Sequence, residues 1–181
     1  SFAGAEEGVR AHLQYGGLAG ADALGDVYNG IEALTGSNLG DTLQADGGDN
    51  SLDGGAGDDL LSSWDGDDSL TGGAGDDSLI ANGGGADLYD GGAGTDLVSY
   101  QNAAAAIVVD LGAGTTGGAA ADDTLTGIED LEGSGHADSL AGDAGGNRLS
   151  GGSGADSLSG GAGDDTLTGG GHGDSLDGGA G

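Results

Sequence analysis

Two nine-residue stretches, GGAGDDLLS at residues 54–62 and GGAGDDSLI at residues 72–80, decide how this chain folds. GGSGADSLS at 151–159 and GGAGDDTLT at 160–168 repeat the same pattern, G-G-x-G-x-D-x-U-x, in which U is a large apolar residue. A nine-residue period of this kind indicates a solenoid built from stacked repeats. Weaker copies begin at Gly36, Ala45, Ser63, Asn82, Gly91, Gly133, Gly142 and Gly169. A single extra residue, Ala81, interrupts the spacing, and we expect it to form a bulge in a loop.

A longer repeat contains the short one. GIEAL at residues 30–34 returns as GIEDL at residues 127–131, about 97 residues later, so the chain is a tandem duplication. We divide it into a lead segment with irregular β coils (1–35), a first nonapeptide β-roll array (36–98), a second lead segment (99–132) and a second, truncated array (133–181). Because the last array stops within the pattern, we expect the chain to be a piece of a longer protein.

The nonapeptide predicts a turn followed by a short strand. Its first six positions hold Gly, Asp, Asn and Ala, which tolerate tight turns, and its last three hold one large aliphatic residue between small or polar ones. Parallel coils stacked about 4.8 Å apart would bring these aliphatic residues together inside, so we predict an elongated all-β solenoid. The predicted core residues are Leu43, Leu52, Leu61, Leu70, Leu79, Tyr89, Val98, Leu140, Leu149, Leu158, Leu167 and Leu176.

The lead segments also carry strand patterns. Ile107, Val109 and Leu111 alternate with other residues and are predicted to share one face of a strand, while Ile128 and Leu131 are predicted to point inward. Residues 112–122 are predicted to form a flexible loop. We expect the solenoid to continue through this region as wider, irregular coils.

The acidic position of the nonapeptide poses an electrostatic problem. Stacking predicts one row of Asp41, Asp59, Asp77 and Asp96, and a second row of Asn50, Asp68 and Asp87. Two carboxylates one coil apart repel by roughly 3–4 kcal/mol at an effective dielectric constant near 20, which over a whole row exceeds the usual stability of a domain. A divalent cation between coils reverses this effect, and turn carbonyls can complete an oxygen shell that suits Ca²⁺ better than Mg²⁺ or Zn²⁺. We therefore expect several bound Ca²⁺ ions.

The nonapeptides resemble those of the RTX (repeats-in-toxin) calcium-binding family. The resemblance implies a right-handed parallel β-roll, type I secretion of an unfolded chain, and folding in extracellular calcium. It assigns metal ligation to Asp41, Asp59, Asp77, Asp96, Asp68, Asp87, Asp138, Asp156, Asp174 and Asp165, to Asn50 and Asn147 as weaker ligands, and to the carbonyls of Gly55, Gly57, Gly73 and Gly75. The nonapeptides at Ala45 and Ser63 depart from the pattern because they lack the leading pair of glycines.

Composition excludes several partners. The formal net charge is −30, with 2 basic against 32 acidic residues, so the surface repels nucleic acids and anionic lipid headgroups. There is no cysteine, and the longest apolar run, residues 103–109, is too short to cross a membrane. The expected partners are therefore calcium and further copies of the chain or neighbouring repeats, without nucleic acid and without membrane insertion.

Other residues and motifs do not indicate a further functional site. His12, His136 and His172 occupy dissimilar positions and are predicted to be solvated, and Trp64 replaces a turn glycine and is predicted to be exposed. No H-E-x-x-H or G-x-S-x-G motif occurs, and the acidic residues follow the nine-residue period rather than the spacing of a catalytic pair, so we expect no enzyme activity. Ice binding would need a regular outward ladder, whereas the outward positions are mixed.

Two functions remain open. The first is a calcium-binding structural segment of a larger secreted or cell-surface protein, such as an adhesin, an S-layer protein or a matrix filament. The second is an accessory module that helps a secreted enzyme, such as a protease, lipase or alginate epimerase, to leave the cell and fold. The tandem units favour the structural role.

Overall fold

A computed structural model of the protein describes residues 1–13, 17–18 and 30–181. All regular secondary structure in these residues is β-strand. The described residues therefore contain no helix that could span a membrane. The strands are β1 (Arg10–His12), β2 (Gly17–Leu18), β3 (Ala33–Thr35), β4 (Thr42–Gln44), β5 (Ser51–Ala56), β6 (Leu60–Ser62), β7 (Ser69–Ala74), β8 (Ser78–Ile80), β9 (Leu88–Ala93), β10 (Leu97–Ser99), β11 (Ile107–Asp110), β12 (Thr115–Gly118), β13 (Thr124–Thr126), β14 (Asp130–Glu132), β15 (Ser139–Ala141), β16 (Arg148–Ser150), β17 (Ser157–Ser159), β18 (Thr166–Thr168) and β19 (Ser175–Asp177).

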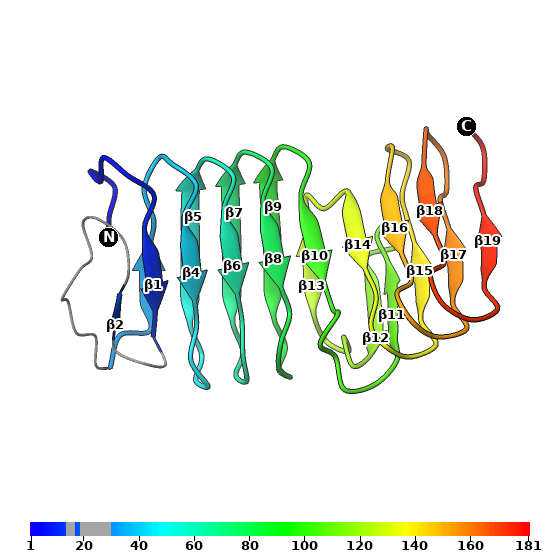
Figure 1. Cartoon of the computed structure of the whole chain (residues 1–181), viewed down its shortest axis with the longest axis horizontal. Coiled ribbons are helices and arrows are strands. Elements are labelled where there is room, and N and C mark those ends of the chain that lie inside the picture. Colours follow the sequence, from blue (N-terminus) through cyan, green and yellow to red (C-terminus); the bar gives the residue numbers. More distant parts are fainter. Residues whose placement is uncertain (14–16, 19–29) are drawn as a thin grey trace.

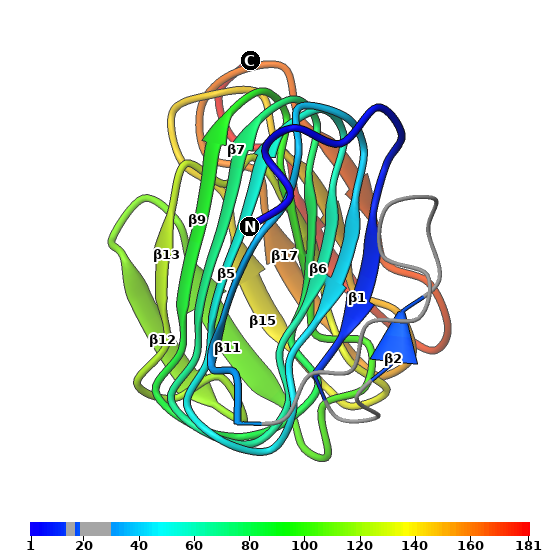
Figure 2. The ribbon, with the colours of Figure 1, turned by 90° about the vertical axis from the view of Figure 1, so that its left-hand side faces the viewer.

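The strands form the two walls of an elongated solenoid, as predicted (Figure 1). One wall is a nine-stranded sheet in the order β18-β16-β14-β10-β8-β6-β4-β1-β2, parallel except for β2. The other wall holds two five-stranded sheets, β13-β9-β7-β5-β3 and β12-β11-β15-β17-β19. Figure 2 looks along the stack from its N-terminal end and shows the walls facing one another. From β3 to β10 and from β14 to β19, successive strands alternate between the walls, so two nonapeptides complete one coil.

The predicted aliphatic ladder fills the space between the walls. Leu43, Leu61 and Leu79 are in register in one wall, and Leu52 and Leu70 are in register in the other. All of the predicted core residues are buried except the last two. Leu167 is only partly buried and Leu176 is 49% exposed, because the final coil has no further coil stacked on it. Each fully buried leucine contributes about 1.5–3 kcal/mol of burial free energy.

The solenoid continues through the second lead segment. β10 pairs with β14 in parallel, so the nine-stranded sheet runs without a break across this region. Ile107, Val109, Ile128 and Leu131 are buried as predicted, and Leu111 packs against the core. The predicted loop at 112–122 is partly wrong, because it contains β12, which pairs antiparallel with β11 in a hairpin. This hairpin separates the two sheets of the interrupted wall.

The second copy of the repeat is turned by half a coil relative to the first. The equivalent pairs β1–β4 and β11–β15 lie in opposite walls. The reason is that the first array contributes seven strands, β4 to β10, and an odd number of alternating strands brings the next lead segment to the other wall.

The extra residue of the first array lies elsewhere than predicted. Ala81 is buried and its N–H bonds to the carbonyl of Ser99, as Ser63 bonds to Ile80 in the preceding coil. Ala81 thus occupies a regular position in the stack. The additional residue lies in the turn between Ala81 and Gly85, which stacks on Gly66.

Candidate metal centres

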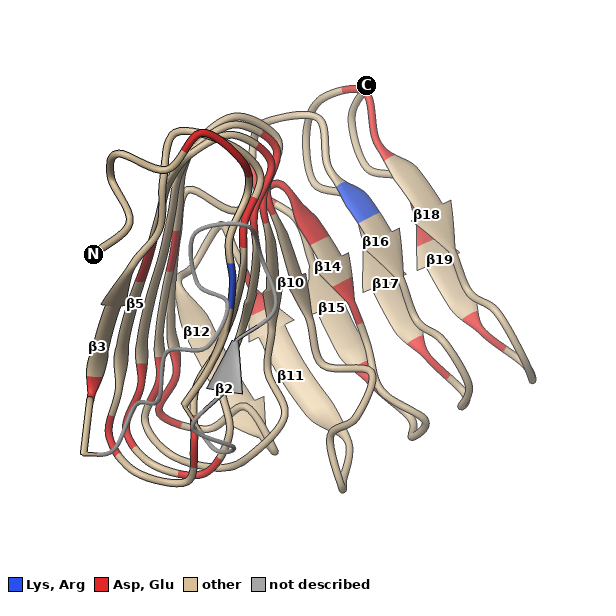
Figure 3. Cartoon of the chain, turned by 60° about the vertical axis from the view of Figure 1, so that its left-hand side comes forward, with Lys and Arg blue, Asp and Glu red and all other residues tan. Residues whose placement is uncertain are grey.

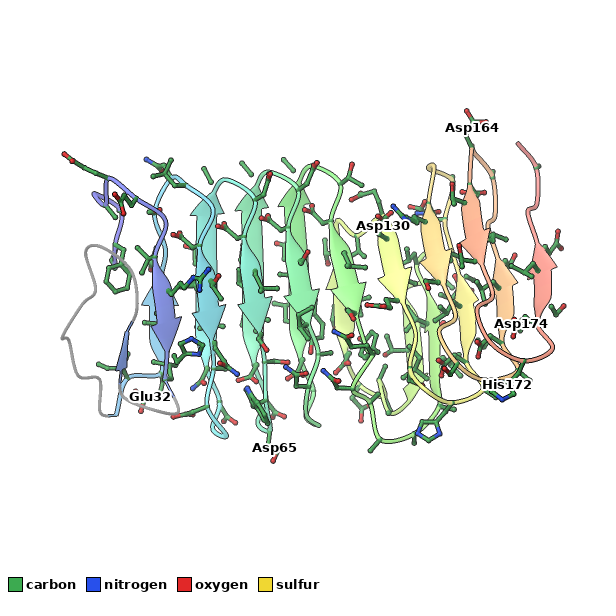
Figure 4. The ribbon with its side chains drawn as sticks, in the orientation of Figure 1. Glu32, Asp65, Asp130, Asp164, His172 and Asp174 are labelled. Atoms are coloured by element: carbon green, nitrogen blue, oxygen red, sulfur yellow. The ribbon has the colours of Figure 1, made fainter. Side chains whose placement is uncertain are left out.

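The turns lie along two opposite edges of the solenoid, and the acidic residues recur along both (Figure 3). We define the upper edge, in the view of Figure 1, as the turns at 36–41, 54–59, 72–77, 91–96, 127–129, 142–147 and 160–165. The lower edge contains the turns at 45–50, 63–68, 81–87, 133–138, 151–156 and 169–174. In Figure 4, Asp164 marks the upper edge, and Asp65 and His172 mark the lower one.

The upper row is assembled by hydrogen bonds from one coil to the next. The backbone N–H of Asp41 donates to Oδ1 of Asp59 (2.7 Å), that of Asp59 to Asp77 (2.8 Å), and that of Asp77 to Asp96 (2.8 Å). The predicted row is therefore confirmed. Each carboxylate is fixed through one oxygen, which leaves the other oxygen to be accounted for.

The lower row follows the same rule. The backbone N–H of Asn50 donates to Oδ1 of Asp68, that of Asp68 to Asp87, and that of Asp87 to Asp123, at 2.8, 2.8 and 3.0 Å. Asp123 belongs to the second lead segment and extends this row by one member that sequence analysis missed. In the second array the equivalent bonds run from Ile107 to Asp138, Asp138 to Asp156, Asp156 to Asp174 and Asn147 to Asp165.

Five of these carboxylates have a buried second oxygen with no hydrogen-bond partner. They are Asp59, Asp77, Asp96, Asp156 and Asp165. The oxygen lies over the first glycine of its own turn: a Cβ atom on Gly54 would lie 2.2 Å from Asp59 Oδ2 and 2.7 Å from the carbonyl oxygen of Gly72 in the next coil. Carboxylate and carbonyl oxygens therefore meet where only a glycine fits. Gly72 and Asp77 repeat this arrangement, with the carbonyl of Gly91 completing it.

The second residue of the turn determines whether that oxygen finds a partner. Where it is Ser37, Asp46, Trp64, Ser134 or Asp143, its N–H donates to the side-chain oxygen of the sixth residue. Where it is a glycine with positive φ, as at Gly55 (105°) and Gly73 (115°), the carboxylate oxygen remains without a partner. A turn that begins with two glycines thus leaves the second carboxylate oxygen of its sixth residue without a donor. In a turn whose second residue is not glycine, the N–H of that residue donates to this side chain.

A group of tyrosines satisfies two further carboxylates near the junction of the repeats. The hydroxyl of Tyr89 donates to Asp87 Oδ2 (2.8 Å) and also contacts Ser63 Oγ (2.9 Å). The hydroxyl of Tyr100 donates to Asp123 Oδ2 (2.9 Å). The two rings meet edge to face with centroids 6.3 Å apart. These buried acids are held by protein groups alone.

Burial raises the pKa values of the row carboxyls. The pKa of Asp59 rises to about 7, because of burial first and then of the neighbouring carboxylates of Asp77, Asp41 and Asp58, although the N–H of Asp41 opposes the rise. Burial raises the pKa of Asp68 to about 6, and it raises the pKa values of Asp77 and Asp96. The ionised row is therefore costly without a compensating cation.

The predicted ligand carbonyls of the turns stack from one coil to the next. The carbonyl oxygens of Gly55 and Gly57 face Gly73 and Gly75 of the next coil, with distances of 2.2 and 2.3 Å to an ideal Cβ there. The carbonyls that meet the unpartnered carboxylates belong instead to the first glycine of each turn. Sequence reasoning missed them, although the invariance of that position in the strong nonapeptides is a usable signal.

The available donors suit a hard cation. Within residues 1–13, 17–18 and 30–181, no three Asp, Glu or His side chains converge as a metal-binding group, so any site on the rows must also use backbone carbonyls. Such all-oxygen sets fit Ca²⁺, which accepts mixed carboxylate and carbonyl shells, whereas Zn²⁺ prefers nitrogen and sulfur. The histidines do not join the rows. Trp64, predicted to be exposed, is half-buried.

Fold and turns together define a calcium-binding β-solenoid. The RTX calcium-binding nonapeptide repeat matches the chain at residues 35–70, 65–98, 123–158, 132–167 and 150–181. These matches span most of the sequence, so the chain belongs to the RTX calcium-binding nonapeptide repeat family. No curated protein gives a significant match to it.

Proposed function

We propose that this chain is a structural segment of a secreted or cell-surface protein, which folds and stiffens when calcium binds in its turns. The observation that supports this most directly is the set of buried carboxylate oxygens without partners at Asp59, Asp77, Asp96, Asp156 and Asp165. Calcium would supply the positive charge that these oxygens lack and would join adjacent coils through carboxylate and carbonyl ligands. The repetition of the site along the solenoid makes the response cooperative.

We propose the remaining predicted ligands as weaker sites. The side-chain oxygens of Asp41, Asn50, Asp68, Asp138 and Asn147 already accept an N–H within their own turn, and Asp87 accepts the Tyr89 hydroxyl. A calcium ion would have to replace these bonds, which costs part of its binding energy. Asp174 lies in the final coil and is partly exposed.

We also propose that the segment has no catalytic activity of its own. The acidic side chains bond to backbone N–H groups in a regular series along both edges. This arrangement serves stacking of the coils. Any chemistry would then belong to other parts of the protein.

The test is a calcium titration of residues 1–181 followed by far-ultraviolet circular dichroism, with magnesium as the control cation. We expect a steep transition from coil to β structure with calcium alone, reversed by a chelator. D59N should shift the midpoint to higher calcium, because it neutralises an unpartnered carboxylate. D58N is the matched control: Asp58 is the exposed neighbour of Asp59 in the same turn, and asparagine keeps an acceptor for the bond from the Asp76 N–H (2.9 Å), so D58N should shift the midpoint much less than D59N. A chain that is β-rich in chelator, or that stays unfolded in millimolar calcium, would contradict the proposal.

A further inference from the structure

The connection between β13 and β14 differs from every regular turn of the upper edge. Gly127, Ile128 and Glu129 form this connection. Leu125 pairs with Tyr89 and Leu131 pairs with Val98, so six positions separate Leu125 from Leu131, whereas nine separate Tyr89 from Val98 in the preceding coil. This short turn stacks directly on the last turn of the first array, residues 91–96. It is therefore the place where the two repeats meet along the upper edge.

Glu129 takes the position that an aspartate holds in the regular coils. Its Oε2 accepts the backbone N–H of Asp96 at 3.0 Å, just as Asp96 Oδ1 accepts the N–H of Asp77 at 2.8 Å. The backbone N–H groups of Glu129 and Asp130 both donate to the carbonyl of Asp96, at 3.2 and 2.9 Å. The extra methylene of glutamate lets its carboxylate reach the row even though the turn is three residues shorter.

Gly127 replaces the first glycine of a regular turn. A Cβ atom on Gly91 would lie 2.1 Å from the carbonyl oxygen of Gly127 and 2.7 Å from Asp96 Oδ2. The carbonyl of Gly91 has the same relation to Gly72 and Asp77 in the preceding coil. Asp96 is fully buried and its Oδ2 has no hydrogen-bond partner, so this oxygen points into the junction unsatisfied.

We propose that Asp96, Glu129 and the carbonyl oxygen of Gly127 form a calcium site that joins the first array to the second repeat. Glu129 lies outside the nonapeptide pattern, so the lead segment contributes a ligand of its own. Two carboxylates and a carbonyl offer an all-oxygen donor set, and one divalent cation neutralises both charges. The inference rests on the proposed calcium-dependent folding, and it adds that calcium ties the two repeats together.

The chain contains a matched control for this site. Glu32 stands in the same GIE sequence of the first lead segment, and it is exposed at the lower edge near the N-terminal end, away from the junction at residues 127–129 (Figure 4). Ile31 beside it is 39% exposed, whereas the equivalent Ile128 is 5% exposed under the first array. A substitution at Glu32 therefore changes the same local sequence without touching a junction.

The experiment counts calcium ions per chain by native mass spectrometry and measures hydrogen exchange of the β10–β14 ladder. E129Q retains a hydrogen-bond acceptor for the Asp96 N–H but loses the charge. We expect E129Q to bind one ion fewer than the unaltered chain and to lose the calcium-dependent protection of β10 and β14. E32Q should match the unaltered chain in both measurements. D96N should lose the same ion as E129Q.

Each other result has a defined meaning. An unaltered ion count and unaltered protection in E129Q would overturn the junction site while leaving calcium-driven folding intact. Equal losses in E32Q and E129Q would overturn it too, because the effect would then follow net charge alone. If E129Q does not fold in calcium, E129D provides the decision: its carboxylate is too short to reach the row, so retention of the full ion count would exclude the site. Absence of any calcium binding by the unaltered chain would defeat both proposals.

Discussion

At the residue scale, one turn position separates an unpartnered carboxylate, which we propose as a metal ligand, from a carboxylate that the protein satisfies. Asp59 and Asp41 stand in the same row and accept the same kind of interstrand bond. They differ because Gly55 leaves the second oxygen of Asp59 without a partner, while the N–H of Ser37 binds that of Asp41 at 2.6 Å. Glycine or another residue at this position thus decides whether the second carboxylate oxygen has a hydrogen-bond donor or is left for a cation.

The first glycine of the turn is equally restrictive. In G72A the new Cβ would lie 2.3 Å from Asp77 Oδ2, so the carboxylate must move away from the carbonyl of Gly91. We expect a loss of stability in calcium of about 1–3 kcal/mol and a weaker site, measured by denaturant unfolding and calcium titration. G47A is the control, because nothing lies within 4 Å of a Cβ at Gly47. Equal effects of the two substitutions would contradict the proposed role of Gly72.

The raised pKa of Asp59 predicts an opposite response to pH with and without calcium. Its folded pKa of about 7 lies above the ordinary value of 3.8, so the protonated carboxyl favours folding below about pH 4, and this contribution is lost as pH rises towards 7. The calcium-free chain should therefore gain β structure on acidification. In saturating calcium the ionised form is the ligand, so acidification should weaken folding. Circular dichroism measured from pH 4 to 8, once in calcium and once in chelator, follows the β content in both states. If the β content changes in the same direction with pH in both, the proposed role of Asp59 is wrong.

The Tyr89 hydroxyl satisfies the carboxylate of Asp87 by a hydrogen bond rather than by calcium. Y89F removes the hydroxyl that serves Asp87 Oδ2 and Ser63 Oγ, leaving a buried carboxylate oxygen without a donor. The free energy of unfolding in saturating calcium should fall by about 1–3 kcal/mol. S63A retains the bond between Tyr89 and Asp87 and should cost less. The two costs are compared by urea unfolding, and a larger cost for S63A would show that Asp87 does not depend on this bond.

At the element scale, the structural repeat is the coil of two nonapeptides, with one upper turn and one lower turn, rather than the single nonapeptide. The upper turns at 54–59, 72–77 and 91–96 extend the strands, so that Gly55 pairs with Gly73 and Gly73 with Gly92, whereas the lower turns at 45–50 and 63–68 lack this extension. The strand positions and the aliphatic ladder were predictable because period and face follow directly from sequence. Sequence alone could not predict three features: the hairpin strand β12, the position of the extra residue and the proposed role of Glu129. These features depend on which coil stacks on the lead segment.

Deletions test this unit. Removal of residues 54–71 excises one full coil and returns every later strand to its own wall, so the chain should retain a sharp calcium transition. Removal of residues 63–71 excises a single nonapeptide and places later upper turns on the lower edge, where their glycine pairs face turns of the other kind. We expect the shorter deletion to lower the melting temperature in calcium more than the longer one. The reverse order would show that the two edges are interchangeable.

At the scale of the whole molecule, the odd number of strands in the first array reverses the face on which the second lead segment sits. Glu32 and Asp130, near equivalent points of the two copies, consequently stand at opposite edges (Figure 4). The parity of a repeat count is thus a geometric variable that the genome can change in one step. Recombination that adds or removes two nonapeptides lengthens or shortens the rod and keeps its hairpins where they were. Recombination that changes the count by one turns everything beyond it to the other side, without altering a single residue of the segment that is turned.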